Sequence, residues 1–151
     1  MEQITMKRCY IYFVVGGMRN MKYKFPALII KEEDGFVVEF PDLEDAFTQG
    51  DTWEEAFENA EDVLNLMLWN REENNIPIPQ PSLIDEIDVP TNATIALFKA
   101  DTLEYRKLHD TRSVRKNVTI PSWLNTLAIN KNINFSNLLQ NALMNELGIE
   151  K

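Results

Sequence analysis

The sequence has little of the side-chain chemistry from which many protein sites are built. It contains one cysteine, Cys9, and one histidine, His109, among 151 residues. One cysteine cannot form an internal disulfide, and structural zinc sites need several cysteines or histidines. The sequence therefore predicts a chain without a structural disulfide, metal or cofactor, as expected for a protein of the reducing cytoplasm.

Long hydrophobic runs are also missing. A helix that spans a bilayer needs about 20 predominantly apolar residues, and no run in the sequence approaches that length. The early apolar patch CYIYFVV is short and is followed by GGMRN rather than by a small-residue cleavage site. We therefore expect no membrane association and no secretion signal, and we interpret residues 1–20 as a leader or flexible extension.

Basic residues are scarce in one part of the chain only. Residues 21–90 hold 18 acidic and 4 basic side chains, a net charge of −14, whereas residues 111–151 hold 5 basic and 2 acidic, a net charge of +3. An acidic surface repels nucleic acid and attracts basic proteins, and a basic segment can approach phosphates. The two parts therefore suit different partners, although an ordinary solvated surface is the alternative for the acidic part.

The stretch FTQGDTWEEAFENA, residues 47–60, marks the start of a helix. Thr52 and Glu55 have the spacing of a capping box, and Gly50 allows a close approach into the cap. No lysine follows this glycine, which argues against a phosphate-binding loop. Apolar residues then recur every three or four positions on one face: Trp53, Ala56, Phe57, Ala60, Val63, Leu64, Met67 and Leu68. The acidic residues off this face are interpreted as solvated.

Strand patterns lie on both sides of this helix. Residues 23–31 and 36–40 predict a β-hairpin with an Asp-Gly turn at 34–35. Residues 46–48 predict a short third strand, and residues 93–98 predict another. Strands combined with one long helix predict an α+β domain.

Proline and polar segments divide the chain. The run IPIPQPS, residues 76–82, is predicted to end the helix in an extended conformation, because proline cannot continue a helix. We assign residues 21–100 to the α+β domain and residues 101–112 to a linker, with a short polar helix over 103–109 as the alternative. Residues 113–149 form a second predicted domain.

The second domain begins with an alternating pattern. Residues 113–120, SVRKNVTI, alternate as a β-strand does. One face carries the polar side chains Arg115, Asn117 and Thr119. The other carries Val114, Val118 and Ile120, with Lys116 as its charged exception.

Two helices are predicted after this strand, the first capped by Ser122 and the second by Asn134. One strand and two helices make about 40 residues, a size that usually needs disulfides, metal or oligomerisation. Dimerisation is the remaining choice, and it would pair each strand with its copy in a ribbon-helix-helix arrangement. Such a ribbon fits the DNA major groove, where arginine and asparagine can contact bases; the alternative is a polar solvent face on a dimerisation element.

Both parts of the chain resemble one family. The run YKFPALIIKEEDGFVVEFPDLEDAFTQGDTWEEAFENAEDVL, followed by IPIPQPS, resembles the HicB antitoxins. The segment SVRKNVTIPSWLNTLAINKNINFSNLLQNAL is similar to the ribbon-helix-helix tail that many of them carry. The likeness covers residues 21–149, and the blocks EFPDL, TQGDTWEEA and IPIPQPS are specific in that order.

The resemblance implies a fold, partners and a function. It implies a truncated ribonuclease H-like N-terminal domain followed by a dimeric ribbon-helix-helix domain. It also implies a non-enzymatic antitoxin that masks HicA, a small basic toxin that cleaves messenger RNA. The complex of the antitoxin with HicA is expected to repress its own operon. The expected partners are therefore a HicA-like toxin, operator DNA and a second copy of the chain, with a higher assembly as a further option.

Site residues follow from the resemblance together with the charge pattern. The acids expected to contact the toxin lie at a strand-to-strand corner and at the start of the helix: Asp42, Glu44, Asp45, Glu54, Glu55 and Glu58. Aromatic contacts or strand addition are alternatives to them. The DNA contacts are expected from the strand, with phosphate bound where the second helix begins: Arg115, Lys116, Asn117, Thr119, Asn134 and Ser136.

Two other functions compete with the antitoxin. The first is a transcription factor whose N-terminal domain senses a small ligand. The second is a residual nuclease, because a ribonuclease H site uses carboxylates that converge on two metal ions. The central candidates for such a site are Glu39, Asp42, Asp45 and Asp51, but their spacing does not match a metal site.

Overall fold

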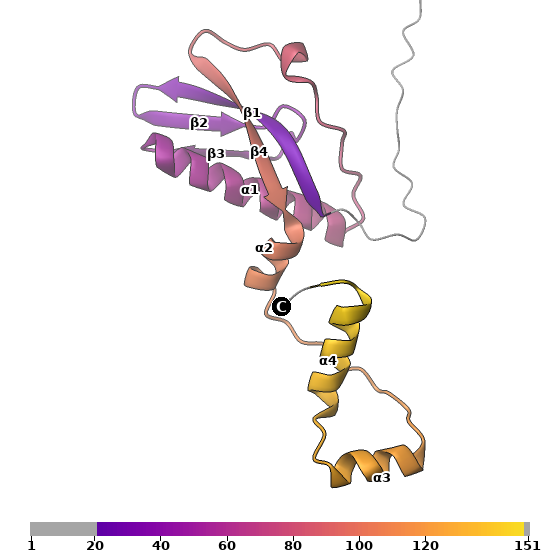
Figure 1. The fold of residues 1–151 in the computed structure, drawn as a ribbon. Helices are drawn as coiled ribbons and strands as arrows, with labels where there is room; N and C mark the ends of the chain where they lie inside the picture. Colours follow the sequence, from indigo (N-terminus) through magenta and orange to yellow (C-terminus); the bar gives the residue numbers. More distant parts are fainter. Residues whose placement is uncertain (1–20, 150–151) are drawn as a thin grey trace, which may run out of the picture. The chain divides into compact units, whose positions relative to one another are not determined.

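The computed structural model describes residues 21–149, which form two compact units over 21–111 and 112–149. The predicted leader and Cys9 lie outside the described residues. The first unit contains a sheet and two α-helices, and the second contains two further α-helices (Figure 1). The predicted α+β class is therefore confirmed.

The sheet of the first unit has four antiparallel strands. They are β1 (Lys22–Glu32), β2 (Gly35–Glu39), β3 (Phe47–Gly50) and β4 (Ala93–Asp101), in the order β3-β2-β1-β4. The predicted hairpin is present, but its two-residue turn is Glu33-Asp34, and Gly35 already pairs with Glu32. Gly35 has a φ of +149°, a conformation that favours glycine.

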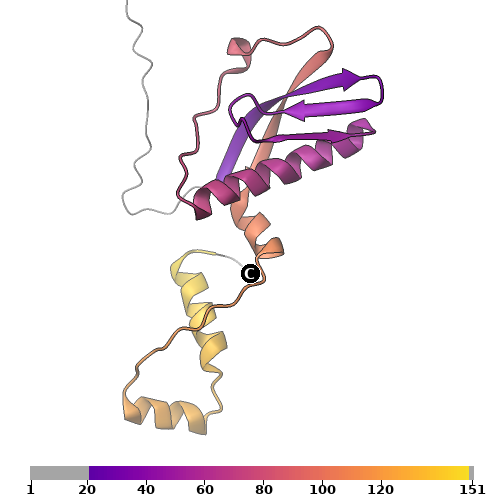
Figure 2. The same cartoon turned by 180° about the vertical axis from the view of Figure 1, so that it is seen from behind.

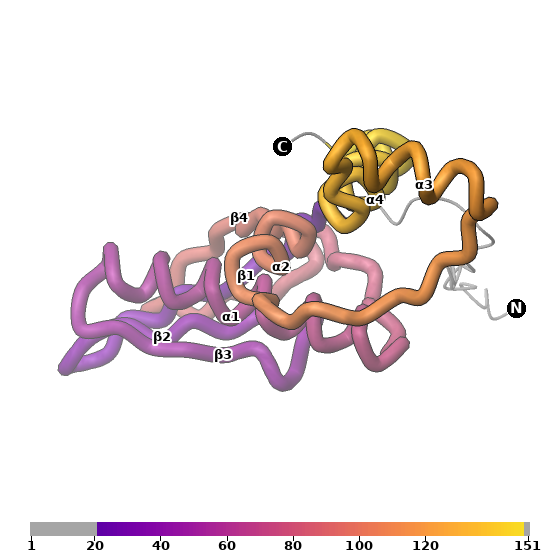
Figure 3. Tube along the Cα trace, turned by 90° about the horizontal axis from the view of Figure 1, so that it is seen from below, coloured from indigo at the N-terminus to yellow at the C-terminus, as the bar shows by residue number. Residues whose placement is uncertain are grey.

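Helix α1 (Trp53–Glu73) covers one face of this sheet (Figure 2). Helix α1 lies against β2, β3 and β4, as the Cα trace in Figure 3 allows the reader to follow. Small side chains on the helix, Ala56 and Ala60, let its backbone approach the strands closely, and larger apolar side chains from both layers fill the remaining space. The resulting core consists of Phe25, Ala27, Ile29, Val38, Phe40, Leu43, Ala46, Ala56, Ala60, Leu64, Leu68, Phe98 and Ala100.

The capping box at the start of α1 is confirmed. The Thr52 hydroxyl accepts a hydrogen bond from the Glu55 amide at 3.1 Å, and the Glu55 carboxylate accepts one from the Asp51 amide at 3.0 Å. Gly50 is needed just before it, because a Cβ there would lie 2.8 Å from the Cα of Ala56. The close approach that Gly50 was predicted to allow is therefore present.

The segment after α1 is held to the sheet by one side chain. Residues 76–83 have no regular secondary structure, as the prolines predict, and a short 3-10 helix, η1 (Ile84–Glu86), follows. The carboxylate of Asp42 accepts hydrogen bonds from the Ser82 amide at 3.0 Å and from the Ser82 hydroxyl at 2.6 Å. This pair fixes the middle of the segment beside the turn between β2 and β3.

The linker predicted over residues 101–112 is folded for most of its length. Strand β4 continues to Asp101, and helix α2 (Thr102–His109) packs against α1. Asp101 caps α2 by accepting a hydrogen bond from the Glu104 amide at 3.1 Å. Of the two predictions for this segment, the short polar helix over 103–109 is confirmed, and residues 110–112 have no regular secondary structure.

The second unit contains α3 (Ser122–Asn130) and α4 (Phe135–Glu146). The Asn134 cap is confirmed, since its side chain accepts a hydrogen bond from the Asn137 amide at 3.0 Å. The Ser122 cap is wrong, because Pro121 occupies the capping position and no side chain caps α3. Residues 113–120 form no strand in the described chain, where no neighbouring strand pairs with them.

Candidate partner-binding surfaces

The three predicted toxin contacts at the β2–β3 turn differ in their surroundings. Asp42 is half-buried, and its carboxylate accepts the two hydrogen bonds from Ser82. Asp45 is exposed, with its Oδ2 4.0 Å from Nη2 of Arg71, and Glu44 is exposed. Asp42 therefore holds the chain in place, whereas Glu44 and Asp45 present charge to the solvent.

The three predicted contacts on α1 differ in the same way. Glu55 is part of the capping box, while Glu54 and Glu58 are exposed in the first turns of the helix. Trp53 lies beside them with its ring packed on Phe36 and Phe57, at centroid distances of 5.4 and 5.3 Å. The structure brings the six predicted acids to two places, a turn and a helix start, and four of them are open to a partner: Glu44, Asp45, Glu54 and Glu58.

A buried carboxylate was missed by the sequence analysis. Glu72 is buried, and its carboxylate accepts hydrogen bonds from the hydroxyl groups of Tyr23 at 2.7 Å and Thr102 at 3.0 Å. Nη2 of Arg106 lies 2.8 Å from the other carboxylate oxygen. Its signal was present in the sequence, because Glu72 continues the four-residue spacing of the buried positions Ala60, Leu64 and Leu68. The network ties α1 to β1 and α2.

Aromatic stacking joins α1 and α2 at the surface. Tyr105 packs on Trp69 at 5.8 Å and stacks with His109 at 4.2 Å, and its hydroxyl donates to Asp62 at 3.0 Å. Burial, this hydrogen bond and the negative charge of Asp62 raise the pKa of Tyr105 from 10.0 to about 12. The Tyr105 hydroxyl therefore stays protonated and keeps donating throughout the physiological pH range. His109 is exposed and takes part in this stack.

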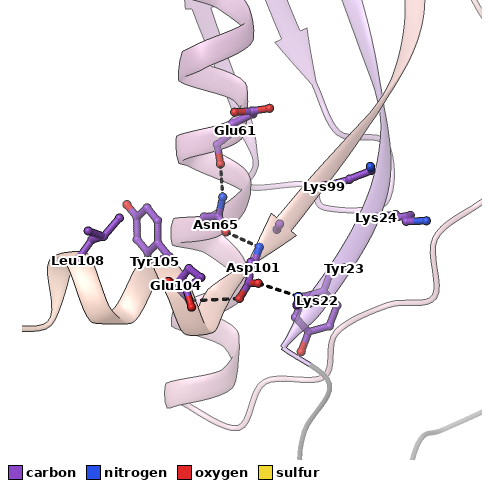
Figure 4. A pocket seen from close by; sticks show the side chains of 11 residues that line it. Lys22, Tyr23, Lys24, Glu61, Asn65, Lys99, Asp101, Glu104, Tyr105 and Leu108 are labelled. Carbon is purple, nitrogen blue, oxygen red and sulfur yellow. Dashed lines mark hydrogen bonds and ion pairs between the residues drawn. The ribbon is translucent and has the colours of Figure 1, made fainter. Parts of the chain in front are cut away.

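A shallow pocket of about 660 Å³ lies where β1 and β4 meet α2 (Figure 4). Three lysines line it together with three acids, Glu61, Asp101 and Glu104, and Lys22 pairs with Asp101 at 3.4 Å. Lys24 lies directly opposite Lys99 on the neighbouring strand, an arrangement of like charges that destabilises a strand pair. The opposite charges that line this pocket balance, so it presents no net charge to a partner.

The predicted DNA contacts are accessible. The four contacts predicted within residues 113–120 are exposed: Arg115, Lys116, Asn117 and Thr119. Asn134 and Ser136 are exposed at the start of α4, where Asn134 is occupied as the helix cap.

The apolar side chains of the second unit are exposed as well. Ala128 is its only buried residue among those described. Val114 is 79% exposed, Trp123 66% and Leu138 55%. Other large apolar side chains of the unit are also open to solvent: Val118, Leu124, Leu127, Ile129, Ile133, Phe135, Leu139, Leu143 and Leu147. A single copy of this unit therefore leaves most of its apolar surface uncovered.

Residues 21–149 show neither a membrane span nor a metal site. They contain no helix that is long and apolar enough to cross a membrane, and no cluster of three or more metal-ligating side chains. Of the carboxylates considered for a nuclease, Asp42 binds Ser82, and Asp45 lies beside Arg71.

A match to a protein-family model decides the family. Residues 25–142 match the HicB-like antitoxin of bacterial toxin-antitoxin systems. The chain belongs to this family. The resemblance to HicB antitoxins inferred from the motifs of the sequence is thereby confirmed.

Individual HicB proteins show how far the similarity extends. Antitoxin HicB 1 of Photorhabdus laumondii is 43% identical over 75 residues, which are 48% of this chain and 48% of the relative. Antitoxin HicB 2 of the same organism is 40% identical over 78 residues, 52% of this chain and 55% of the relative. The chain thus spans about half the length of the curated HicB relatives it matches.

One solved structure has a similar fold. It is a chain of a toxin-antitoxin complex from Streptococcus pneumoniae, with 26% identity and a TM-score of 0.55. The similarity covers 83% of the HicB-like chain described here and 99% of the other chain. The α+β fold is therefore shared over most of the length of both chains.

Proposed function

We propose that this protein is the antitoxin of a HicA-HicB system. In this proposal the first unit binds and neutralises a HicA-type ribonuclease toxin, and the second unit dimerises and binds operator DNA to repress its own operon. The observation that carries the proposal is membership of the HicB-like family over residues 25–142. The charge difference between the two parts of the chain supports the division of labour.

The acidic surface supports toxin binding. A toxin that binds RNA needs a positively charged surface, and an anionic protein can compete for that surface. Residues 21–90 carry a net charge of −14, and exposed acids remain available at the β2–β3 turn and at the start of α1, among them Glu44 and Glu58. We take the sheet covered by α1 to be a truncated ribonuclease H-like fold that serves as a binding scaffold without catalysis.

The exposed apolar surface of the second unit supports dimerisation. Burial of apolar area contributes about 25 cal/mol per Å², and a single copy leaves twelve large apolar side chains of this unit exposed. A second copy would cover them, and it would supply the strand that residues 113–120 lack. The pair would then form a two-stranded ribbon backed by four helices.

The ribbon would present the DNA contacts. Alternation along 113–120 places Arg115, Asn117 and Thr119 on its outer face, from which arginine can contact guanine and asparagine can contact adenine. Phosphate would bind at the start of α4 near Ser136, because the first backbone amides of a helix have no partner within the helix. Lys116 would lie on the inner face of the strand, and its long side chain would reach the DNA backbone from the end of the ribbon.

A growth assay tests toxin neutralisation. The full chain, or residues 21–111 alone, is co-expressed with the small basic toxin encoded beside it. We expect both forms to restore growth and to co-purify with the toxin, because the first unit has its own core. If neither form restores growth or binds the toxin, the antitoxin assignment is wrong. A ligand-sensing transcription factor then becomes the better hypothesis.

Substituting Asn117 with alanine tests the DNA assignment. We expect the substitution to weaken binding to the operator by about 1–3 kcal/mol, as for a residue that contacts a base, and to leave toxin binding unchanged. Electrophoretic mobility shifts with operator DNA and co-purification with toxin measure the two activities. An equal loss of both would contradict the division between the two units.

A further inference from the structure

A patch of exposed apolar side chains surrounds the β2–β3 turn. Phe47 begins β3 and is 67% exposed, and Leu83 and Ile84, at the start of η1, are 61% and 49% exposed. These residues are far apart in the sequence. The two hydrogen bonds between Asp42 and Ser82 hold the segment that leads to Leu83 beside the β2–β3 turn, and Phe47 directly follows that turn.

The turn itself is rigid. The Phe40 amide donates to the carbonyl oxygen of Ala46 at 3.1 Å, and the Ala46 amide donates to that of Leu43 at 2.8 Å. Phe40, Leu43 and Ala46 are all buried in the core. Phe47 is therefore exposed on a fixed backbone, and fixed, exposed aromatic and aliphatic side chains lose little entropy when a partner covers them.

Acidic side chains form the rim of this patch. Glu39 lies directly opposite Phe47 across β2 and β3, Glu44 and Asp45 lie in the turn, and Asp85 and Glu86 follow Ile84. All five are exposed. The one basic side chain paired with them in the described contacts is Arg71, which is largely buried and lies 4.0 Å from Asp45. The rim therefore has a net negative charge.

We propose that this corner, defined by Phe47, Leu83 and Ile84, is the principal docking surface for the toxin. The inference rests on the proposed function and names the part of the first unit that carries it. Protein interfaces place apolar and aromatic side chains at the centre and charged groups at the rim, and this acidic rim complements a basic protein. The toxin would cover the apolar centre, and its lysines and arginines would pair with Glu39, Glu44 and Asp85.

The start of α1 competes with this corner as the docking surface. Glu54 and Glu58 are exposed there, but Trp53, the large apolar side chain beside them, packs on Phe36 and Phe57 and is 40% exposed. The corner offers more apolar area to a partner. The acids of α1 would then increase the rate of association and contribute little to the affinity.

The experiment compares two matched variants of the full-length chain. Phe47→Ala combined with Leu83→Ala removes the centre of the corner without a change in charge. Leu66→Ala, which shortens an exposed leucine on the outer side of α1, is the control. Each protein is co-expressed with the toxin encoded beside it, and toxin affinity is measured with the purified components. We expect the double variant to bind at least about 100-fold more weakly, and the control to bind within about threefold of the unmodified chain.

Charge variants show whether a loss of toxin binding comes from the docking surface or from a loss of folding. Glu44→Lys with Asp85→Lys alters the corner, and Glu54→Lys with Glu58→Lys alters α1, while circular dichroism reports whether each variant folds. We expect the corner pair to weaken toxin affinity most, and the α1 pair mainly to slow toxin association. Unchanged affinity in both corner variants, or a larger loss from the α1 pair, would overturn the inference. Failure of the unmodified chain to bind toxin would instead overturn the proposed function.

Discussion

Replacing Leu138 with aspartate should convert the proposed dimer into a monomer. Leu138 lies on α4, is 55% exposed in the single chain, and is covered by the second copy in the proposed dimer. Truncating a buried leucine costs about 2–5 kcal/mol, and a buried carboxylate adds the cost of its desolvation. With two such sites in a symmetric dimer, the dissociation constant should rise by at least about 1,000-fold. Light scattering and analytical ultracentrifugation measure the change.

Gln140→Asp is the matched control for this prediction. It places the same charge two residues further along α4, on a side chain that is polar and exposed. We expect the Gln140 variant to remain dimeric and to bind operator DNA, and the Leu138 variant to lose both properties while it still binds toxin. A monomeric unmodified chain, or equal dimerisation of the two variants, would contradict the proposed covering of α4.

The sequence predicted well those features that depend on neighbouring residues. The apolar stripe of α1, the Thr52 capping box and the Asn134 cap all involve side chains within one or two helical turns, and each is present. The positions of the four strands also follow from short-range patterns, apart from shifts of a few residues at the strand ends. Local spacing is sufficient in these cases because the interacting groups are brought together by the helix or strand itself.

Contacts between distant residues were not predictable in this way. Asp42 was interpreted as a toxin contact because it is acidic, but its partner Ser82 lies 40 residues away. The exposed corner at Phe47 and Leu83 depends on that same contact. The tail gives a different lesson, since the alternation of residues 113–120 specifies a strand whose pairing partner is absent from a single chain. Pattern alone cannot distinguish an isolated strand from half of an intermolecular ribbon.

Replacing Arg106 with methionine should destabilise the first unit. Methionine keeps much of the length of the side chain but removes the charge that faces Glu72, whose side chain is 2% exposed. Breaking a fully buried ion pair by removing one partner costs about 3–5 kcal/mol. Because Arg106 is partly exposed, and Tyr23 and Thr102 still donate to Glu72, we expect a smaller loss of about 2–3 kcal/mol. Urea denaturation followed by circular dichroism measures it.

Lys107→Met distinguishes this buried network from ordinary surface charge. Lys107 is the next residue on α2 and pairs with Glu104 at 2.6 Å, but both side chains are exposed, so its loss should change stability by no more than about 0.5 kcal/mol. Adding Glu72→Gln to Arg106→Met should recover part of the lost stability, because a neutral amide no longer needs the guanidinium while it can still accept hydrogen bonds from Tyr23 and Thr102. If Arg106→Met and Lys107→Met unfold at the same urea concentration, the buried Glu72 carboxylate that joins α1 to α2 does not depend on Arg106.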